Sequence, residues 1–435
     1  MHTPTPRSSM VPVLVAGSIV TAVTLGVRAT MGLFPDEIDA SLGVGIDTVG
    51  LTVALQNLIW GLGQPIVGAI ADRFGAVRVL FVGAVIYAAG LLVMATASGP
   101  ASLYFGGGFV TGLGMSAASF AVVLAAMGKL VDPQRRTFAL GIATAFGSFG
   151  HFVLVPLTGV LIGSLGWRTA LALLALVAVS IVLVLRPLRT PPAGVPGGSG
   201  TDTAPDAATA EAADHDEPLR AVLTHAARHR DYVMLNAAFF VCGFHVTFIG
   251  VHLPKSLTDA GHSARIATLS WAFIGLFNIV GAFAAGVLGS RIDKSRLLSI
   301  IYMGRAVAFV GLLVLPATPL VALGFGAVVG LVWLASVPLT SGIVLGQFGV
   351  RNAGTLFGVV FLCHQIGAFA GSYGAGVLRE ATGSYDLWWW LAAALGIVAA
   401  ALHLAISDQP AARPGDPAPE HAGAGLRHGG ASAAG

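Results

Sequence analysis

Long apolar runs separated by short polar turns repeat along most of the chain. They cover residues 11–34, 51–71, 79–98, 102–127, 138–163 and 169–186, and then 231–254, 266–289, 297–315, 320–347, 354–379 and 387–406. Each run is close to or above the roughly 20 residues that a helix needs to cross the hydrocarbon core of a bilayer. The pattern predicts an all-α membrane protein with twelve transmembrane helices in two halves of six.

The composition supports this fold class. Hydrophobic residues make up 55% and charged residues only 10% of the 435-residue chain, and the mean hydropathy is +0.83. So little charge cannot cover the surface of a water-soluble protein of this length. The 58 glycines fit a bundle of membrane helices, because small residues let helix backbones approach closely in lipid. Cys242 and Cys363 lie inside apolar runs, where we expect core residues without a disulfide or a metal site.

The segments outside the apolar runs differ in composition. Residues 187–219 are rich in Pro, Gly, Ala and acidic residues and cannot form a packed core, so a flexible linker is expected there. The tail that follows the last run has a similar composition and is expected to be disordered. The predicted organisation is an N-terminal tail (1–10), a first half (11–186), a linker (187–230), a second half (231–406) and a C-terminal tail (407–435).

Positive charge is unevenly distributed between the two sides of the predicted bundle. When the loops are assigned alternately to the two sides, most Lys and Arg residues fall on one of them. The other side receives only Arg168, Lys255, Arg265 and Arg379. By the positive-inside rule, the first side is cytoplasmic, and it includes both termini and the linker.

The two halves read as repeats of one sequence. The glycines of the fifth run, including Gly141 and Gly150, recur in the eleventh run as Gly358 and Gly367. Repeats in the same orientation imply a pseudo-two-fold axis along the membrane normal, a binding site between the halves and alternating access by rocking. The loop after the second run repeats after the eighth: Gly68, Arg73 and Arg78 recur as Gly286, Arg291 and Arg296.

The loop GAIADRFGAVR (68–78) is similar to the G-x-x-x-D-R-x-G-x-x-R signature of the major facilitator superfamily. The matching residues are Gly68, Asp72, Arg73, Gly75 and Arg78. The second copy has Ser290 in place of the aspartate. The chain further resembles the bacterial monocarboxylate-porter-like branch of that superfamily in GVRATMGLF (26–34), ALQNLIWGLGQPIVGAIADRFG (54–75), PQRRTFALGIATAFGSFG (133–150) and TLFGVVFLCHQIGAF (355–369). This resemblance implies a transporter of the bacterial cytoplasmic (inner) membrane.

The signature loop is a candidate conformational latch. Gly68 allows two helices to cross closely, and the resemblance implies that Asp72 lies beside the start of the eleventh helix. A carboxylate at a helix N-terminus is stabilised by about 0.3–1 kcal/mol. Arg73 and Arg78 can bind lipid phosphates or partner acids. We expect this loop to hold the cytoplasmic side closed; the alternative is an anchor that only fixes the topology.

The candidate substrate site follows from the ionisable residues inside the spans, which are costly in lipid. No Asp or Glu lies deep in a span, whereas Arg28, Arg305 and several histidines do, so the cavity suits an anion. Arg28 lies in the first helix, which lines the cavity in the resembled fold, and a guanidinium fits a carboxylate. The repeat maps Arg28 onto His245, and we expect the two to face each other.

Further polar residues within the spans can complete this site. Gln56, Asn57, Asn278, His364 and Gln365 are candidates for substrate contacts, or else form hydrogen bonds between helices. His245, His364 and His151 are candidates for proton coupling, because histidine titrates near physiological pH. Arg305 has a gating role or a structural one. Pro338 is expected to bend the tenth span.

One departure from the resembled branch concerns the eighth helix. Monocarboxylate porters resemble each other in an arginine, and often an acid, in that helix, and here it offers only Asn278. Either Arg28 and the histidines form the carboxylate site, or the substrate is not a simple monocarboxylate.

The leading functional hypothesis is a secondary transporter that moves a small, monocarboxylate-like organic anion with proton symport. A Gly-Lys-Ser/Thr phosphate loop is absent, so ATP drive, enzymatic activity and a cofactor are not expected, and no basic cluster indicates nucleic acid. One alternative is a drug or metabolite exporter, with a roomy apolar cavity and no dependence on Arg28. Another is a membrane sensor that binds ligand without flux.

Overall fold

The computed structural model describes residues 10–190 and 218–407, and these residues are nearly all helical. Within these ranges, 12 helical segments are long and apolar enough to cross a membrane, which confirms the predicted fold class. The spans of the first half are α1 (Met10–Thr30) with η1 (Met31–Leu33), α3 (Ile46–Phe74), α4 (Ala76–Ala95), the series α5 (Pro100–Ser102), η2 (Leu103–Val110), α6 (Thr111–Ala117) and α7 (Phe120–Leu130), then α8 (Arg136–Leu165), and α9 (Trp167–Ser180) with η4 (Ile181–Val184).

The second half repeats this arrangement. Its spans are α12 (Arg230–Asp259), α13 (Ala264–Leu288), α14 (Lys294–Val314), the pair α15 (Pro319–Leu331) and α16 (Ser336–Phe348), α17 (Ala353–Thr382) and α18 (Asp386–Leu404). Two short helices lie outside the spans, α2 (Pro35–Leu42) and α11 (Leu219–Arg228). Because α11 falls within 187–230, the described end of the expected linker is helical. Residues 191–217, and the tails at 1–9 and 408–435, lie outside the described ranges.

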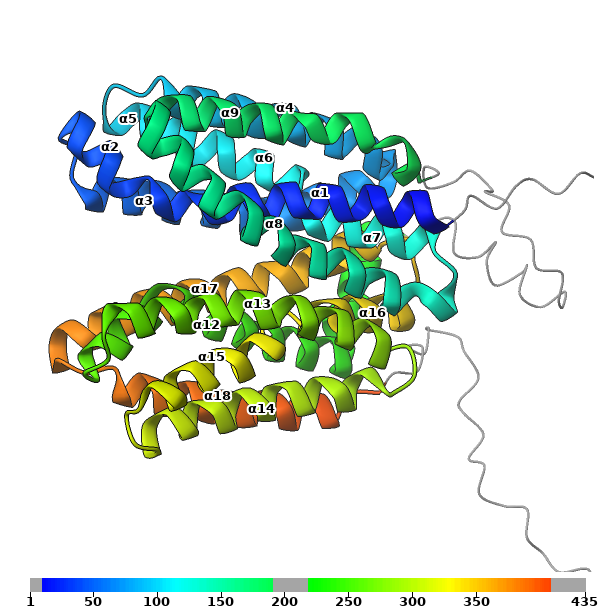
Figure 1. The fold of residues 1–435 in the computed structure, drawn as a ribbon. Helices are drawn as coiled ribbons and strands as arrows, with labels where there is room; N and C mark the ends of the chain where they lie inside the picture. The colour runs from blue at the N-terminus through cyan, green and yellow to red at the C-terminus, as the bar shows by residue number, and fades with distance from the viewer. Residues whose placement is uncertain (1–9, 191–217, 408–435) are drawn as a thin grey trace, which may run out of the picture.

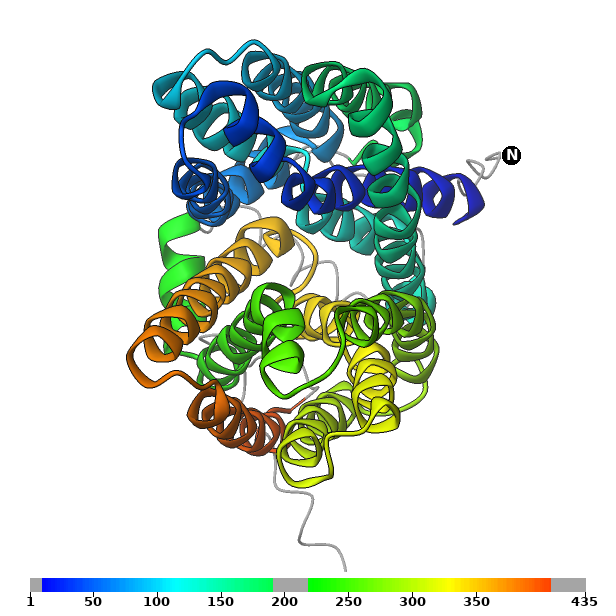
Figure 2. The same ribbon diagram turned by 60° about the vertical axis from the view of Figure 1, so that its left-hand side comes forward.

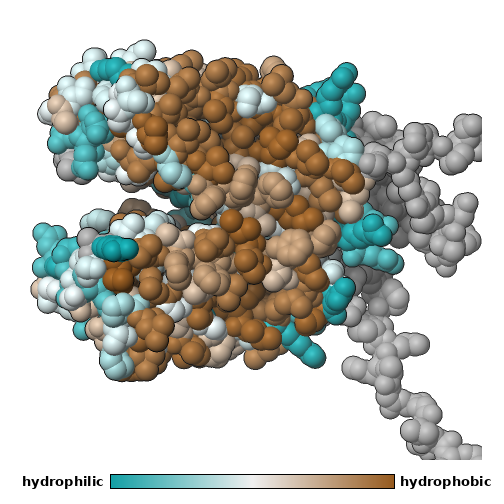
Figure 3. All heavy atoms as spheres, viewed as in Figure 1, coloured by the Kyte–Doolittle hydropathy of each residue, from teal (hydrophilic) through white to brown (hydrophobic). Residues whose placement is uncertain are grey.

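The two halves form separate bundles that meet at one end (Figure 1). Both described chain ends, Met10 and Ser407, lie at that end, which we call the closed end. At the opposite end, beside α2, the bundles stand apart, and the surface shows a cleft between them (Figure 3). Figure 2, turned toward this open end, shows the two bundles side by side. The structure is therefore closed at one end and open at the other.

The outer surface fits a lipid environment. Brown, apolar residues cover the sides of both bundles in Figure 3, and hydrophilic residues collect at the two ends. Large side chains such as Leu176, Leu183 and Leu320 are 65%, 82% and 81% exposed. In water such exposure would be unfavourable, whereas in a bilayer these side chains contact lipid tails.

Close glycine contacts join the halves at the closed end. A Cβ added to Gly68 of α3 would lie 2.1 Å from the carbonyl oxygen of Gly354 in α17. A Cβ added to Gly141 of α8 would lie 2.5 Å from the Cα of Gly286 in α13. Gly286 is the repeat of Gly68, so the α3–α17 and α8–α13 crossings are equivalent under the predicted repeat.

The fourth and tenth spans are each interrupted. The fourth breaks at Ala118–Ser119, between α6 and α7, and the tenth at 332–335, between α15 and α16. The expected bend at Pro338 is therefore displaced. Proline lacks an N–H and its ring clashes with the carbonyl four residues earlier, so it is tolerated in the first turn of a helix. Pro338 lies in the first turn of α16, and the break comes just before it.

Packing between α1 and α8 gives a test of the fold. A Cβ on Gly150 would lie 1.9 Å from the carbonyl oxygen of Ala22, whereas a Cβ on Gly159 of the same helix meets nothing within 4 Å. We expect Gly150→Val to destabilise the protein by about 2 kcal/mol or more through overpacking. The thermal midpoint of the detergent-purified protein measures this effect, with Gly159→Val as the matched control. Equal midpoints for the two variants would contradict the observed packing.

Candidate functional site

The Asp72 carboxylate connects three helices at the closed end. Its Oδ1 accepts hydrogen bonds from Lys129 Nζ of α7 at 2.6 Å and from the Gly354 N–H at 3.1 Å. Its Oδ2 accepts from the N–H and the hydroxyl of Thr355, at 2.8 and 2.9 Å. The carboxylate thus lies on the N-terminal turn of α17, where the unpaired N–H groups and the helix dipole favour an anion. Lys129 also donates to the Arg351 carbonyl at 3.1 Å.

The other signature residues have different structural roles. Gly75 ends α3 with φ +91, a conformation that favours glycine, and so allows the tight turn into α4. Arg73 and Arg78 are exposed; Arg73 stacks on Phe74, and Arg78 donates to the Phe74 carbonyl at 3.5 Å. Of the five predicted latch residues, Gly68 and Asp72 make the described contacts between the halves.

Arg28 is the charged centre of the first half. Its Nη2 donates to Asn57 Oδ1 of α3 at 3.1 Å, and its guanidinium carbon lies 5.1 Å from the ring centre of Trp60. Its Nε is buried without a hydrogen-bond partner. Among the residues that the structure describes, no carboxylate forms an ion pair with Arg28. The cation is therefore only partly satisfied.

Two more polar groups lie within reach of the Arg28 charge. These are Tyr87 of α4 and His151 of α8, and both interact electrostatically with the guanidinium. The Tyr87 hydroxyl and His151 Nε2 are buried without hydrogen-bond partners. Arg28, Asn57, Tyr87 and His151 form a group of polar side chains inside the first half, and we call these four residues the Arg28 cluster. By contrast, Gln56 is buried against Gly112 of α6, inside the first half.

The break in the fourth span supports Trp60 beneath Arg28. Ser119 is the N-cap of α7, and its hydroxyl accepts from the Val122 N–H at 3.2 Å and from Gln64 Nε2 at 2.9 Å. Gln64 Oε1 in turn accepts from Trp60 Nε1 at 3.1 Å. The indole orientation is therefore fixed by hydrogen bonds that start at the break.

The second half reaches the Arg28 cluster through α17. Gln365 Nε2 donates to the Asn57 carbonyl at 3.2 Å, and Gln365 Oε1 lies 3.1 Å from His364 Nδ1. The His364 ring stacks on Phe361, with centroids 5.3 Å apart. The structure thus brings Arg28, Asn57, Gln365 and His364 together in one chain of contacts across the two halves.

His245 lies elsewhere, contrary to the expectation that it faces Arg28. Its Nε2 is 2.8 Å from the Ala392 carbonyl of α18, and its ring packs edge-on against Phe309 of α14 at 4.9 Å. The side chain is fully buried inside the second half. Because the His245 side chain is short, it stays among these residues of α14 and α18, whereas the longer Arg28 side chain reaches α3.

Arg305 and Asn278 bind the backbone groups released by the break in the tenth span. Arg305, 1% exposed, donates from Nε to the Val332 carbonyl at 3.0 Å and from Nη2 to the carbonyls of Val332 and Trp333 at 2.7 and 2.5 Å. Asn278 Oδ1 accepts the Leu334 N–H at 3.0 Å. Asn278 Nδ2 also donates to Ser148 of α8 at 2.5 Å, across the halves. These contacts match the structural alternative for both residues.

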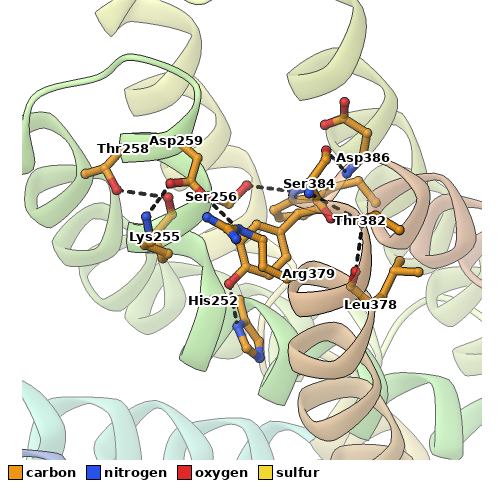
Figure 4. A network of polar contacts seen from close by, with 12 residues as sticks. His252, Lys255, Ser256, Thr258, Asp259, Leu378, Arg379, Thr382, Ser384 and Asp386 are labelled. Carbon is orange, nitrogen blue, oxygen red and sulfur yellow. Dashed lines mark hydrogen bonds and ion pairs between the residues drawn. The ribbon is translucent and has the colours of Figure 1, made fainter.

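A polar network at the open end of the second half pairs Asp259 with two cations (Figure 4). Asp259 forms ion pairs with Lys255 and, at 2.9 Å, with Arg379 Nε. His252 lies 3.0 Å from the Tyr385 hydroxyl and 2.9 Å from the Ser372 carbonyl. This network joins the ends of α12 and α17.

Several site residues were missed by the sequence analysis. Lys129, Thr355, Trp60, Tyr87 and Ser148 all contact predicted residues, but they lie on other helices. A polar residue in a span is a signal for Ser148 and Tyr87, yet the sequence does not show which residue faces which. Within the described residues, no group of three or more His, Cys, Asp or Glu side chains could hold a metal ion.

Comparisons with known proteins agree with this fold. The family profile described as Major Facilitator Superfamily matches residues 16–372. The chain is 25% identical to monocarboxylate transporter 13 of Bos taurus, over 91% of this chain and 90% of that one. It is 26% identical to the uncharacterized MFS-type transporter YcxA of Bacillus subtilis (strain 168), over 78% and 81%. The fold is similar to the fucose:proton symporter FucP of E. coli, with a TM-score of 0.70, 16% identity and coverage of 92% and 100%.

The Asp72 contacts predict a shift in conformation when the carboxylate is neutralised. Asp72→Asn removes the charge that the α17 N-terminus and Lys129 stabilise, and hydrogen bonds to a charged group contribute about 1.5–3 kcal/mol. We expect the fraction of molecules that are open at this end to rise about tenfold. Distance measurements between labels on the two halves at this end would show it. Asp132→Asn is the control, because Asp132 accepts only from Gln134 in an exposed turn; distances that match wild type would contradict the latch.

The Arg305 contacts predict a stability effect. Arg305→Met leaves the carbonyls of Val332 and Trp333 without donors inside the bundle, which we expect to cost about 3 kcal/mol or more. Arg305→Lys should be intermediate, since one ammonium replaces part of the guanidinium. Thermal midpoints compare these variants with Arg296→Met, an exposed site on the same helix. A midpoint of Arg305→Met equal to that of the control would refute the structural role.

Proposed function

The chain belongs to the major facilitator superfamily of transporters, and from this premise we propose that it carries a small organic anion across the membrane with proton coupling. The observation that supports this most directly is the state of Arg28. It is a cation inside a span, with one neutral hydrogen-bond partner and no carboxylate partner among the described residues. A charge in that position is costly in lipid, and a bound anion would offset the cost.

The chemistry around Arg28 favours a carboxylate. A guanidinium presents a planar fork of donors to both oxygens of a carboxylate. The Asn57 amide, the Tyr87 hydroxyl and the His151 ring surround it with further polar groups, and Trp60 covers one face by a cation–π contact. Monocarboxylate transporters of animals are among the relatives. The arginine of the eighth helix, Arg265, is exposed in the first turn of α13, so Arg28 is the candidate for the anion-binding residue.

Two histidines are placed to couple protons to the anion. His151 lies within the field of Arg28, and His364 is joined through Gln365 to Asn57. An anion that binds Arg28 neutralises its charge and so favours protonation of His151. This ordering predicts symport, in which the proton and the anion stabilise each other's binding.

The charge bias supports a cytoplasmic position for the closed end. The structure then corresponds to an outward-open state, with Asp72 holding the cytoplasmic side together. Rocking of the halves would open that side and close the cleft above Arg28. The multi-pass protein would have both termini in the cytoplasm of a bacterial cell.

Flux measurements test the proposed function. The full-length protein is reconstituted in proteoliposomes, and uptake of a panel of labelled carboxylates is measured with and without an inwardly directed proton gradient. Uptake that rises with the gradient supports anion–proton symport. Failure of every acid, together with export of hydrophobic compounds, would support the exporter instead, and binding without flux would support a sensor.

Arg28 substitutions give the sharpest prediction for this function. Removing one partner of a desolvated charge pair costs about 2–5 kcal/mol, so Arg28→Met should lower the apparent affinity for the transported acid about thirtyfold or more. Arg28→Lys should retain part of it, as a point charge without the fork. Initial uptake rates against acid concentration measure both.

Arg168→Met is the control for the Arg28 variants. Arg168 donates to the carbonyls of Ala95 and Ala97 at 2.7 and 2.9 Å, at the end of α4, and does not contact the Arg28 cluster. We expect it to lower stability and leave the affinity for the acid unchanged. Wild-type affinity in Arg28→Met would rule out the proposed anion site.

A further inference from the structure

The two walls of the cleft above the closed end differ in their chemistry. The Ser148–Asn278 hydrogen bond, at 2.5 Å, joins α8 of the first half to α13 of the second and marks the floor of the cleft. From this floor α8 runs toward the open end and reaches His151 one turn later. On that side the wall is polar and carries the positive charge of Arg28.

The opposite wall is aromatic. On α13, Gly275 and Trp271 lie three and seven residues before Asn278, so the three share one helix face. Seven residues of helix correspond to about 10 Å along the axis. A Cβ on Gly275 would meet nothing within 4 Å, and Trp271 is 38% exposed. Above Asn278 this face therefore borders open space, with an indole at its upper limit.

Trp271 contacts two other elements of the second half. Its ring lies 6.0 Å from that of Trp333, at an interplanar angle of 86°. The Cη2 of Trp271 lies 3.5 Å from the Cβ position of Gly250 in α12. The indole is thus held between α12 and the break in the tenth span.

Trp333, against which Trp271 packs, is held in a fixed position. It lies in the break at 332–335 and is 8% exposed, and its carbonyl oxygen accepts from Arg305. The next residue, Leu334, donates its N–H to Asn278 at 3.0 Å. The hydrogen bonds that hold the interrupted backbone therefore also fix the aromatic pair at the wall.

From these walls we infer that the substrate is a carboxylate joined to a bulky apolar or aromatic body. This rests on the proposed function, because it takes Arg28 as the site of the carboxylate. The carboxylate binds at the Arg28 cluster, and the body lies against Trp271 across the cleft. Aromatic side chains bind apolar surface by burial and ring contacts, and they give a short acid such as acetate nothing beyond its charge.

Equilibrium binding of four probes tests this inference. The probes are phenylacetate, cyclohexylacetate, acetate, and phenylacetamide, which keeps the ring without the charge. Affinity is measured from the ligand-induced rise in thermal midpoint of the detergent-purified full-length protein. Wild type should bind phenylacetate and cyclohexylacetate about tenfold more tightly than acetate, and phenylacetamide more weakly than phenylacetate.

The tryptophan variants separate a binding role from a structural one. Trp271→Ala should remove most of the preference for phenylacetate and leave acetate affinity unchanged, whereas Trp271→Phe should keep much of it. Trp390→Ala is the control, because Trp390 of α18 is 47% exposed and α18 lies on the far side of the second half from the first (Figure 2). A Trp271→Ala variant that loses acetate and phenylacetate affinity equally would overturn the inference.

The result also distinguishes this inference from the proposed function. If all acids bind alike and binding is lost in Arg28→Met, the anion site stands and the aromatic specificity fails. If phenylacetate and phenylacetamide bind alike, without dependence on Arg28, the proposed anion transport fails. Selective binding of phenylacetate that requires both Arg28 and Trp271 supports both.

Discussion

Backbone groups within the hydrocarbon core have no water to bond with, and the interior of this protein depends on how that constraint is met. The fourth and tenth spans both break inside the bundle, and each break releases donors and acceptors. At the first break, the Ser119 hydroxyl accepts hydrogen bonds from a backbone N–H and from Gln64. At the second break, Arg305 and Asn278 form hydrogen bonds with the released backbone groups. Each set of hydrogen bonds also fixes a tryptophan beside the cleft, Trp60 at the first and Trp333 at the second, so satisfying the backbone also shapes the site.

The two arginines inside the spans show how the same constraint separates structure from function. The Arg305 guanidinium donates hydrogen bonds to carbonyl oxygens of its own half, and the side chain is almost fully buried. Arg28 has one amide partner and an indole beneath it, with Nε unpaired. In a low-dielectric interior, a satisfied cation stabilises the fold, and an unsatisfied one favours whatever anion can reach it. That difference in partners, which composition cannot reveal, makes Arg28 the better candidate for substrate.

The sequence predicted the spans and Asp72 at the start of α17 because these follow from hydropathy, charge and a short motif. It also singled out Arg28, Asn57, His364 and Gln365, which the structure brings together. It failed for His245, since a repeat fixes a backbone position but not the partner that a shorter side chain finds. It misplaced the bend at Pro338, because proline marks the start of a half-helix as well as a kink. Which residues meet across the halves depends on helix rotation, which hydropathy does not encode.

The Asp72 contacts belong to one of the two repeats, and they lie at the end of the bundle. Ser290 stands where the second repeat would have the aspartate, and its hydroxyl donates to the Val287 carbonyl at the end of α13. The α8–α13 pair is joined by close packing and by the neutral Asn278–Ser148 hydrogen bond, while the α3–α17 crossing has charge-assisted hydrogen bonds from Asp72. Breaking such bonds in the middle of the membrane would cost several kcal/mol for each bare charge. At the end of the bundle, water can hydrate Asp72 and Lys129 as they separate, so the net cost falls to the small difference between protein and water hydrogen bonds. A carboxylate at this boundary can stabilise the closed conformation of this end and still let it open. A buried ion pair at the depth of Arg28 would be hard to break. This difference is consistent with a substrate site that lacks a fixed acid.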